Sequence, residues 1–167
     1  QEIVLEAETL LAHGFRELVL TGINTALYGT EEAFAYPLTA AEQAAGMHGI
    51  EIIISRLNAL DGDFRIRLSS LEPTVVNADY VKRLLQYEKL CPHLHLSIQS
   101  GSDAVLQAMH RHYSRADYLD IVRVLKVHDP HYGITTDIIC GFPGETDADF
   151  ADSVRIVKEA GFLKVHA

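Results

Sequence analysis

Cysteine is scarce in this sequence. Only Cys91 and Cys140 occur among the 167 residues, which excludes a disulfide-stapled scaffold and predicts a reducing compartment, the cytoplasm. Two cysteines cannot complete a four-cysteine zinc site or an iron–sulfur cluster by themselves. We therefore expect no metal ligands in this chain.

Long apolar runs and basic residues are lacking as well. No run approaches the roughly 18 apolar residues of a membrane helix, and residues 1–8 contain no Lys or Arg of the kind that opens a signal peptide. Lys and Arg number 14 against 23 Asp and Glu, which gives a net charge of -9. Because binding to phosphate backbones depends on a basic surface, we expect this chain alone to bind neither nucleic acid nor a membrane.

The apolar content is high enough for a folded core. Hydrophobic residues make up 48% of the chain and charged residues 22%, with a mean hydropathy of +0.07. These values exclude the disordered, collagen-like and coiled-coil classes. The length suits one domain, so residues 1–167 are expected to form a single domain.

Strand and helix patterns alternate along the chain. Buried strands are predicted over five segments: Glu17–Thr21, Phe64–Leu68, Leu94–Ile98, Ile134–Cys140 and Leu163–His166. Amphipathic helices are predicted around five apolar sets: Ile3–Leu11, Ile50–Leu60, Val81–Leu85, Tyr118–Leu125 and Phe150–Val157. Strands separated by helices require right-handed crossovers and a parallel sheet, so the fold class is α/β. An open doubly wound sheet and a part of a barrel both remain possible, since a complete eight-fold barrel takes about 250 residues.

The signals for a helix are clear near the end of the chain and weak in segment 30–49. The final helix begins with the capping pattern Thr146-x-x-Asp149. Three apolar residues share one face of this helix: Phe150, Val154 and Val157. In segment 30–49, Gly46 and Gly49 interrupt a possible helix, so irregular or partly helical structure is expected there.

Polar and glycine-rich residues follow the predicted strands. They occupy the carboxyl ends, at Thr21–Asn24, Ser69–Pro73, Gln99–Asp103, Gly141–Glu145 and His166. Turns by themselves favour glycine and serine. However, ligands of parallel α/β folds bind at the carboxyl ends of the strands. Five such ends at the same edge of the sheet favour one shared binding site.

Four ordered blocks carry a resemblance to a known family. They are Leu20–Ile23, Arg65–Pro73, His93–Asp103 and Asp137–Thr146, which read LTGI, RIRLSSLEP, HLHLSIQSGSD and DIICGFPGET; Met109, Arg111 and Tyr113 agree with them. In this order and spacing they resemble the radical S-adenosylmethionine (SAM) methylthiotransferases over nearly the whole chain. The SSLEP run and Tyr28–Gly29 are most similar to the branch that modifies threonylcarbamoyladenosine beside the tRNA anticodon, and less to the isopentenyladenosine and ribosomal-protein branches.

The resemblance implies a fold and several partners. The fold would be a partial parallel (β/α)6 TIM-like barrel, of which this chain holds strands two to six and lacks the first. SAM would be cleaved to a 5′-deoxyadenosyl radical. The intact protein would carry two [4Fe-4S] clusters, one on a CxxxCxxC loop after the first strand and one on an N-terminal domain. A C-terminal domain would help to hold the tRNA anticodon loop. None of the cluster cysteines is in this sequence, so we expect this truncated core to ligate no cluster and to be inactive alone.

Two candidate residues follow from the chemistry of SAM together with this resemblance. The fork-shaped guanidinium of Arg111 suits a carboxylate, to which it forms paired hydrogen bonds. Gln99 precedes it at a spacing that the wider superfamily shares, and its amide can donate and accept toward the amino-acid end or the ribose of SAM. As alternatives, Arg111 is a solvated arginine in the run His110–His112, and Gln99 is a loop amide.

Three further candidates complete the expected SAM site. Asp137 lies in an apolar run, where a carboxylate is costly unless it is paired or functional. It would accept hydrogen bonds from ribose hydroxyls, or alternatively form a structural ion pair. Ser70 would take the remaining ribose or amine position. Gly141, with Gly144, would allow the backbone to approach the adenine closely.

Other polar residues are weaker candidates. Asn24 and Glu72 are expected near the target base or the cosubstrate. Glu145 is expected to act only as a negative charge at a helix N-terminus, and Cys140 as a small buried hydrophobic residue. No residue is assigned a catalytic role.

Strand alternation predicts a polar interior. If Gln99 points into the barrel, so do Ser97 and His95, while the intervening leucines and isoleucine face the helices. His93 and His95 form a His-x-His pair, but two ligands at the start of a strand without a third do not predict a metal site.

Two hypotheses about function remain. The first is the central fragment of a radical SAM tRNA methylthiotransferase, which methylthiolates C2 of a hypermodified adenosine next to the anticodon. The alternative is a stand-alone α/β nucleotide-binding module without radical chemistry.

Overall fold

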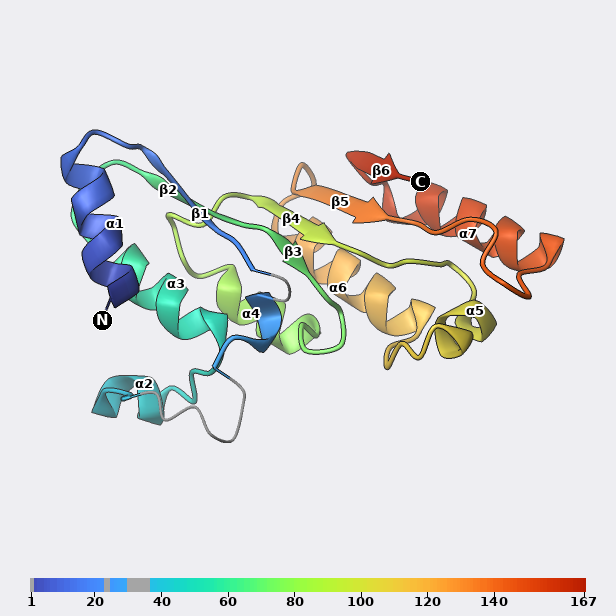
Figure 1. Cartoon of the computed structure of the whole chain (residues 1–167), viewed down its shortest axis with the longest axis horizontal. Helices are drawn as coiled ribbons and strands as arrows, with labels where there is room; N and C mark the ends of the chain where they lie inside the picture. The colour runs from blue at the N-terminus through green and yellow to red at the C-terminus, as the bar shows by residue number, and fades with distance from the viewer. Residues whose placement is uncertain (1, 23–24, 30–36) are drawn as a thin grey trace.

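The computed structural model describes residues 2–22, 25–29 and 37–167. The helices are α1 (Glu2–Ala12), the 3-10 turn η1 (Thr25–Leu27), α2 (Ala40–Ala44), α3 (Ile50–Asn58), α4 (Ala78–Leu84), α5 (Asp103–Ala108), α6 (Arg115–His128) and α7 (Asp147–Ala160). The strands are β1 (Glu17–Leu20), β2 (Arg65–Leu68), β3 (Ser70–Leu71), β4 (His93–Leu96), β5 (Gly133–Asp137) and β6 (Lys164–His166). Figure 1 shows that α1 and α7 lie at opposite ends of the molecule.

All strand pairs are parallel, as the alternating pattern predicts. β1 pairs with β2, and a second sheet has the order β3-β4-β5-β6. The two sheets meet because Ile66 of β2 forms a parallel bridge with Leu90, just before β4. The strands therefore follow one another in sequence order from β1 to β6, and no closure of β6 onto β1 is seen among the described residues.

The second predicted strand differs from its expected form. It was predicted as one segment that ends at Leu68, but the structure continues it past Ser69 as β3. β2 pairs with β1 on one side, whereas β3 pairs with β4 on the other. The break at Ser69 lets one strand serve two neighbours, and it carries Ser70 and Glu72 to the carboxyl edge of the second sheet.

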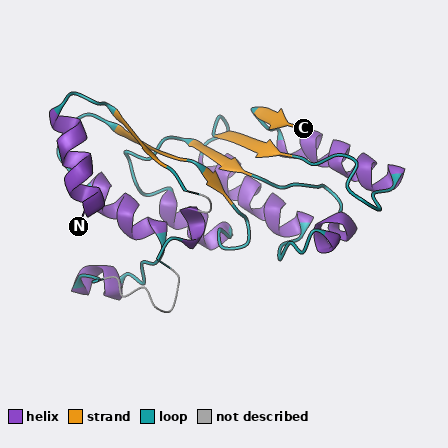
Figure 2. Ribbon diagram, viewed as in Figure 1, coloured by secondary structure: helices purple, strands orange, loops and turns teal. Residues whose placement is uncertain are grey.

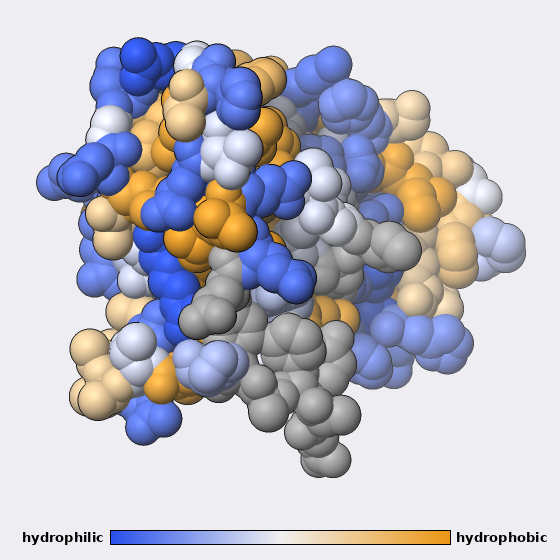
Figure 3. All heavy atoms as spheres, turned by 60° about the vertical axis from the view of Figure 1, so that its left-hand side comes forward, coloured by the Kyte–Doolittle hydropathy of each residue, from blue (hydrophilic) through white to orange (hydrophobic). Residues whose placement is uncertain are grey.

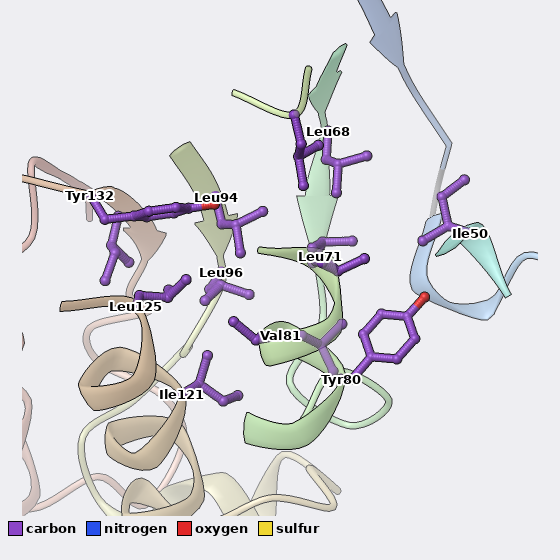
Figure 4. Packing of buried hydrophobic residues seen from close by; sticks show 14 of the residues in the cluster. Ile50, Leu68, Leu71, Tyr80, Val81, Leu94, Leu96, Ile121, Leu125 and Tyr132 are labelled. Atoms are coloured by element: carbon purple, nitrogen blue, oxygen red, sulfur yellow. The ribbon is translucent and has the colours of Figure 1, made fainter. Parts of the chain in front are cut away.

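The helices α3, α4, α6 and α7 lie along one side of the row of strands (Figure 2). The core forms between these helices and alternate strand residues, because side chains of a strand point to opposite faces. Leu94 and Leu96 of β4 are buried against Ile121 and Leu125 of α6 (Figure 4). The predicted inward face of α6 is thus confirmed.

The predicted face of α7 is not the one that the protein buries. Phe150 and Val154 are exposed. The buried residues of α7 are Ser153, Ile156 and Ala160. The reason is a polar contact that periodicity of apolar residues cannot reveal: Ser153 Oγ accepts a hydrogen bond from the backbone N–H of Gly101 at 2.9 Å.

The segment that the sequence marks as irregular contains a short helix where it is described. Thr39 and Glu42 form a reciprocal capping box at the start of α2. Arg56 of α3 binds the Glu42 carboxylate at 2.7 Å, and this ion pair holds α2 against α3. Residues 30–36 of the same segment lie outside the described residues.

A cleft of about 600 Å³ opens at the β1 end of the molecule, between α1, β1, η1 and α3. Exposed apolar side chains, including Phe15 and Val19, occur at this end, and Figure 3 shows apolar atoms interspersed with polar ones there. Thr21 and Gly22 line the cleft, but the expected SAM-binding residues do not. In the part of the chain that the structure describes, no helix has the length and apolar character needed to cross a membrane.

Candidate functional site

The carboxyl ends of β3, β4 and β5 bring most of the expected site residues to one edge. Ser70 of β3 pairs in register with His95 of β4, which pairs with Thr135 of β5. Asp137 ends β5, and Gln99 follows β4. Since these strands are parallel and adjacent, the three expected residues Ser70, Gln99 and Asp137 lie at the same rim.

Arg111 and Glu72 bind each other at this rim. The terminal nitrogen of Arg111 donates to Glu72 Oε1 at 2.5 Å, and each side chain is 29% exposed. The Nε of Arg111 is buried and has no hydrogen-bond partner among the described residues. Arg111 is therefore not a solvated arginine: it lies half-buried beside a carboxylate and keeps an unused donor.

Tyr113 anchors the Arg111 loop to the end of β4. Its hydroxyl donates to the carbonyl oxygens of Ser97 at 3.2 Å and Ile98 at 3.1 Å. Burial raises the pKa of Tyr113 to about 12, so the hydroxyl remains a donor at neutral pH. The Arg111 backbone N–H also donates to Leu106 at the end of α5. These contacts hold Arg111 close to the strand end that carries Gln99.

Gln99 occupies an irregularity in the sheet. Its φ is +70°, in the left-handed region that non-glycine residues seldom adopt. Its N–H donates to Asp137 O, and its own carbonyl accepts from Ile139 N–H. His95 pairs with Thr135 but Gln99 bridges Ile138, so β4 carries one extra residue in this stretch. The predicted alternation holds for His95 and Ser97 but does not extend regularly to Gln99.

Asp137 is the centre of a hydrogen-bonded cluster on the strand face opposite the helices. His95 Nε2 lies 3.0 Å from Asp137 Oδ2, and Ser97 Oγ donates to the same oxygen at 2.9 Å. Partial burial would raise the pKa of Asp137, but the hydrogen bonds from His95 and Ser97, with the nearby charges of His95 and His166, lower it below its usual value. The Asp137 side chain is 42% exposed. The carboxylate is therefore ionised, oriented and accessible.

Gly101 of the SGSD run has a packing role. A Cβ at this position would lie 2.5 Å from the backbone oxygen of Asp152, so only glycine fits against α7. Ser100 and Ser102 also contact α7, through Ser153 and Asp149. This loop is thus glycine- and serine-rich because it is a helix-docking surface.

The structure around the Gly141–Glu145 loop differs in part from what the sequence predicts. Cys140 is exposed and not buried, because it lies beyond the end of β5 at Asp137 and past the last bridge of this stretch, at Ile138. Glu145 stands directly before the Thr146 cap of α7, as expected, and its Oε2 also accepts from the Gly141 N–H at 2.5 Å, so this carboxylate closes the loop as well. Gly141 is exposed with a φ of +76°, a conformation that favours glycine.

The remaining expected residues are less informative. Asn24 lies outside the described residues. The Ser70 side chain is exposed on the rim, and its carbonyl accepts from Thr25 Oγ1 at 3.1 Å.

The residues present fit SAM but not an iron–sulfur cluster. Arg111, Glu72 and Asp137 offer a cation with a free buried donor and two carboxylates, which match the carboxylate, ammonium and hydroxyls of SAM. Cys91 precedes β4 and Cys140 follows β5. Because these strands are parallel, one thiol lies at the amino ends of the strands and the other at the carboxyl ends. Within residues 2–22, 25–29 and 37–167, no group of three or more His, Cys, Asp or Glu side chains could hold a metal ion.

Comparison with known families decides between the two hypotheses at the level of the superfamily. The family model described as Radical SAM superfamily matches residues 1–157. The chain belongs to the radical SAM superfamily. The resemblance inferred from the four sequence blocks is confirmed, and a stand-alone binding module outside this superfamily is not favoured.

Curated relatives of this radical SAM chain are tRNA methylthiotransferases. The chain is 36% identical over 167 residues to threonylcarbamoyladenosine tRNA methylthiotransferase MtaB of Chlamydia pneumoniae. The matched region covers 100% of this chain and 36% of that protein. It is 38% identical over 161 residues to MtaB of Thermotoga maritima, covering 96% and 34%. It is 36% identical over 162 residues to the tRNA-2-methylthio-N(6)-dimethylallyladenosine synthase of Caldicellulosiruptor saccharolyticus, covering 97% and 32%. The chain thus spans about a third of the length of these relatives.

Solved structures show the same fold at low sequence identity. The radical SAM methyltransferase TsrM of Kitasatospora setae matches 97% of this chain and 29% of its own, with a TM-score of 0.66 and 15% identity. Coproporphyrinogen III oxidase HemN of Escherichia coli matches 99% and 36%, with a TM-score of 0.60 and 14% identity. The α/β class with parallel strands is confirmed.

Sequence reasoning missed two features of the site. Glu72 was weighed only for the target base or the cosubstrate in general, but its partner is Arg111. His95 was weighed as a metal ligand and as an inward-facing residue, but it binds Asp137. Part of the signal for the second contact was present, because side chains alternate along a strand and His95 and Ser97 therefore share one face of β4. That Asp137 lies on the same face depends on the pairing of His95 with Thr135.

Proposed function

We propose that this chain is the SAM-binding core of a tRNA methylthiotransferase that modifies C2 of a hypermodified adenosine next to the anticodon. The observation that carries the proposal is the Arg111–Glu72 pair at the rim, with its unpartnered, buried Arg111 Nε. An adjacent pair of opposite charges is complementary to the zwitterionic amino-acid end of SAM. Its position at the carboxyl ends of parallel strands is where such folds bind ligands.

The amino-acid end of SAM would be held by both members of the pair. Arg111 would donate paired hydrogen bonds to the carboxylate. Glu72 would accept from the ammonium group, a more specific role than the general one that the sequence suggested. Tyr113 would keep Arg111 in place through its bonds to the end of β4.

The nucleoside end would be held by the neighbouring strand ends. Asp137 would accept from the ribose hydroxyls, because its carboxylate is ionised and accessible. Gln99 and Ser70 would contribute an amide and a hydroxyl from the adjoining positions. Gly141 would allow the backbone to approach the adenine, since it has no side chain and lies exposed on the loop.

SAM held in this way would supply a 5′-deoxyadenosyl radical, with methionine as the other product, on taking one electron from an iron–sulfur cluster that other parts of the intact protein would hold. With only two cysteines, this chain contributes binding and orientation, and we propose that it is inactive alone. The partial TIM-like barrel without its first strand, two clusters in the intact protein and a cytoplasmic location belong to the same proposal. It is supported by the methylthiotransferase relatives, whose names specify tRNA.

The threonylcarbamoyladenosine branch is the proposed target class. The SSLEP run and Tyr28–Gly29 support it, together with MtaB proteins among the relatives. Relatives named tRNA-2-methylthio-N(6)-dimethylallyladenosine synthase are similarly close in identity. The branch is therefore best tested on the intact enzyme with tRNA of each kind.

The test of the SAM site is Arg111→Ala in the intact protein. We expect SAM binding measured by calorimetry to weaken by about tenfold or more, because charge-assisted hydrogen bonds are lost. Arg111→Lys should give an intermediate loss, since it keeps the charge without the fork. The visible absorption of the clusters should stay unchanged in both variants.

Arg123→Ala is the matched control. Arg123 is an exposed arginine of α6 that pairs with Asp120 on the same helix, so its removal should leave SAM binding as in the parent protein. Equal SAM affinity in the Arg111→Ala, Arg123→Ala and parent proteins would overturn the proposed site.

A further inference from the structure

Two donors from β4 converge on a single oxygen of Asp137. His95 Nε2 lies 3.0 Å and Ser97 Oγ 2.9 Å from Oδ2, and the two donor atoms are 3.1 Å from each other. His95 is only 18% exposed, whereas Asp137 is 42% exposed. The arrangement buries the donors and leaves part of the carboxylate accessible.

The ionised carboxylate fixes the direction of the hydrogen bonds that it receives. A carboxylate only accepts, so His95 Nε2 carries a hydrogen and donates to Asp137. On the other side of the ring, His95 Nδ1 lies 2.8 Å from Thr135 Oγ1. Thr135 Oγ1 also lies 3.2 Å from His93 Nε2, which we assign as the donor.

The electrostatics of His93 agree with this assignment. Burial lowers the pKa of His93, and the positive charges of Arg67 and His95 lower it further. A neutral His93 that donates through Nε2 has an unprotonated Nδ1, and this atom is buried without a partner among the described residues. His93 thus supports Thr135 without competing for the carboxylate.

We propose that His95 and Ser97 are positioning residues that fix the Asp137 carboxylate for binding the vicinal hydroxyls of a ribose. The inference rests on the proposed function, because it takes Asp137 as the ribose acceptor of SAM. Two donors restrict rotation of the carboxylate before a ligand binds, and both of these hydrogen bonds go to Oδ2 and not to Oδ1. Restriction before binding lowers the entropy that is lost on binding.

A purely structural role is the competing explanation. His95 and Ser97 lie next to the irregular stretch at Gln99, so their bonds to Asp137 could only brace β4 against β5. That role would change stability but would not depend on the hydroxyl groups of the ligand. The test therefore compares ligands that differ in one hydroxyl.

The experiment measures equilibrium binding to the intact protein without reductant. The ligands are SAM and its 2′-deoxy and 3′-deoxy analogues. We expect the parent protein to prefer SAM over at least one analogue by about tenfold, the size of a hydrogen bond to a charged group. His95→Ala should reduce that preference to less than about threefold, and Ser97→Ala should reduce it partly. His95→Gln should restore part of it, because its amide N–H can replace Nε2–H.

The controls separate the two proposals. His128→Ala removes an exposed histidine at the end of α6 and should leave the preference unchanged. A preference that persists in Asp137→Ala shows that Asp137 does not bind the ribose, which overturns that part of the proposed function. A preference that is lost in Asp137→Ala but retained in both His95→Ala and Ser97→Ala overturns the positioning inference alone. If His95→Ala does not fold, Ser97→Ala and His95→Gln decide by the same comparison.

Discussion

Single residues at the rim derive their chemistry from their neighbours. Asp137 stands at the end of an apolar run, and its sequence context suggested either a ligand contact or a structural ion pair. The structure gives it both an orienting partner, His95, and solvent access. Arg111 is similar: a terminal nitrogen of its guanidinium binds Glu72, while its Nε has no partner among the described residues.

The lowered pKa of Asp137 predicts how stability depends on pH. A carboxylate whose pKa is lower in the folded state stabilises the fold above its unfolded pKa of about 3.9. This contribution disappears as the pH falls through the folded-state value. Asp137→Asn should therefore be less stable than the parent chain at pH 6, by no more than about 1 kcal/mol because solvent screens the half-exposed group, and the difference should shrink as the pH falls through the lowered pKa of Asp137.

Urea unfolding at pH 6, 4 and 2 measures this difference. The parent chain and Asp137→Asn should converge as the solution becomes more acidic. A difference that stays constant over this range would show that the Asp137 charge is not stabilised by His95 and Ser97.

At the scale of elements, the docking of α7 depends on polar atoms. Ser153 is 3% exposed, accepts from the Gly101 N–H at 2.9 Å and lies 3.3 Å from Ser100 Oγ. The apolar residues Phe150 and Val154 remain on the surface. Apolar periodicity identified the helix correctly, but the buried side was decided by a serine and by the close approach of Gly101.

Ser153→Ala tests this docking. The substitution leaves the buried Gly101 N–H without its acceptor, which should cost about 1–3 kcal/mol of unfolding free energy. Val154→Ala in the neighbouring, exposed position should change it by less than about 0.5 kcal/mol. Equal stability of the two variants in urea unfolding would show that the Ser153 contact does not hold α7.

At the scale of the whole molecule, the parallel strands run in sequence order and both outer strands have one unpaired edge. β1 pairs only with β2, and β6 only with β5, among the described residues. The alternating pattern predicted parallel strands joined by right-handed crossovers, whereas their sequential order was implied only by the family resemblance. The split of the second strand at Ser69 could not be predicted, since it depends on which neighbour each half pairs with.

The overall charge of -9 leads to a prediction about RNA. Binding of tRNA depends largely on contacts of Lys and Arg with phosphates, and acidic residues outnumber basic ones in this chain. We expect no gel shift of tRNA by residues 1–167 at physiological salt, while the intact protein should shift it. A clear shift by the isolated chain, lost at high salt, would contradict this and indicate a local basic surface.

The amino-acid sequence by itself determined the fold class, the superfamily and the strand ends at which the candidate site lies. These depend on local periodicity, capping and short motifs, which are encoded in consecutive residues. Only the tertiary structure decided that Glu72 binds Arg111, that His95 and Ser97 share one oxygen of Asp137, that Cys140 is exposed and which face of α7 is buried. Each of these depends on distances between segments far apart in the chain, and those distances are set by packing and not by sequence spacing.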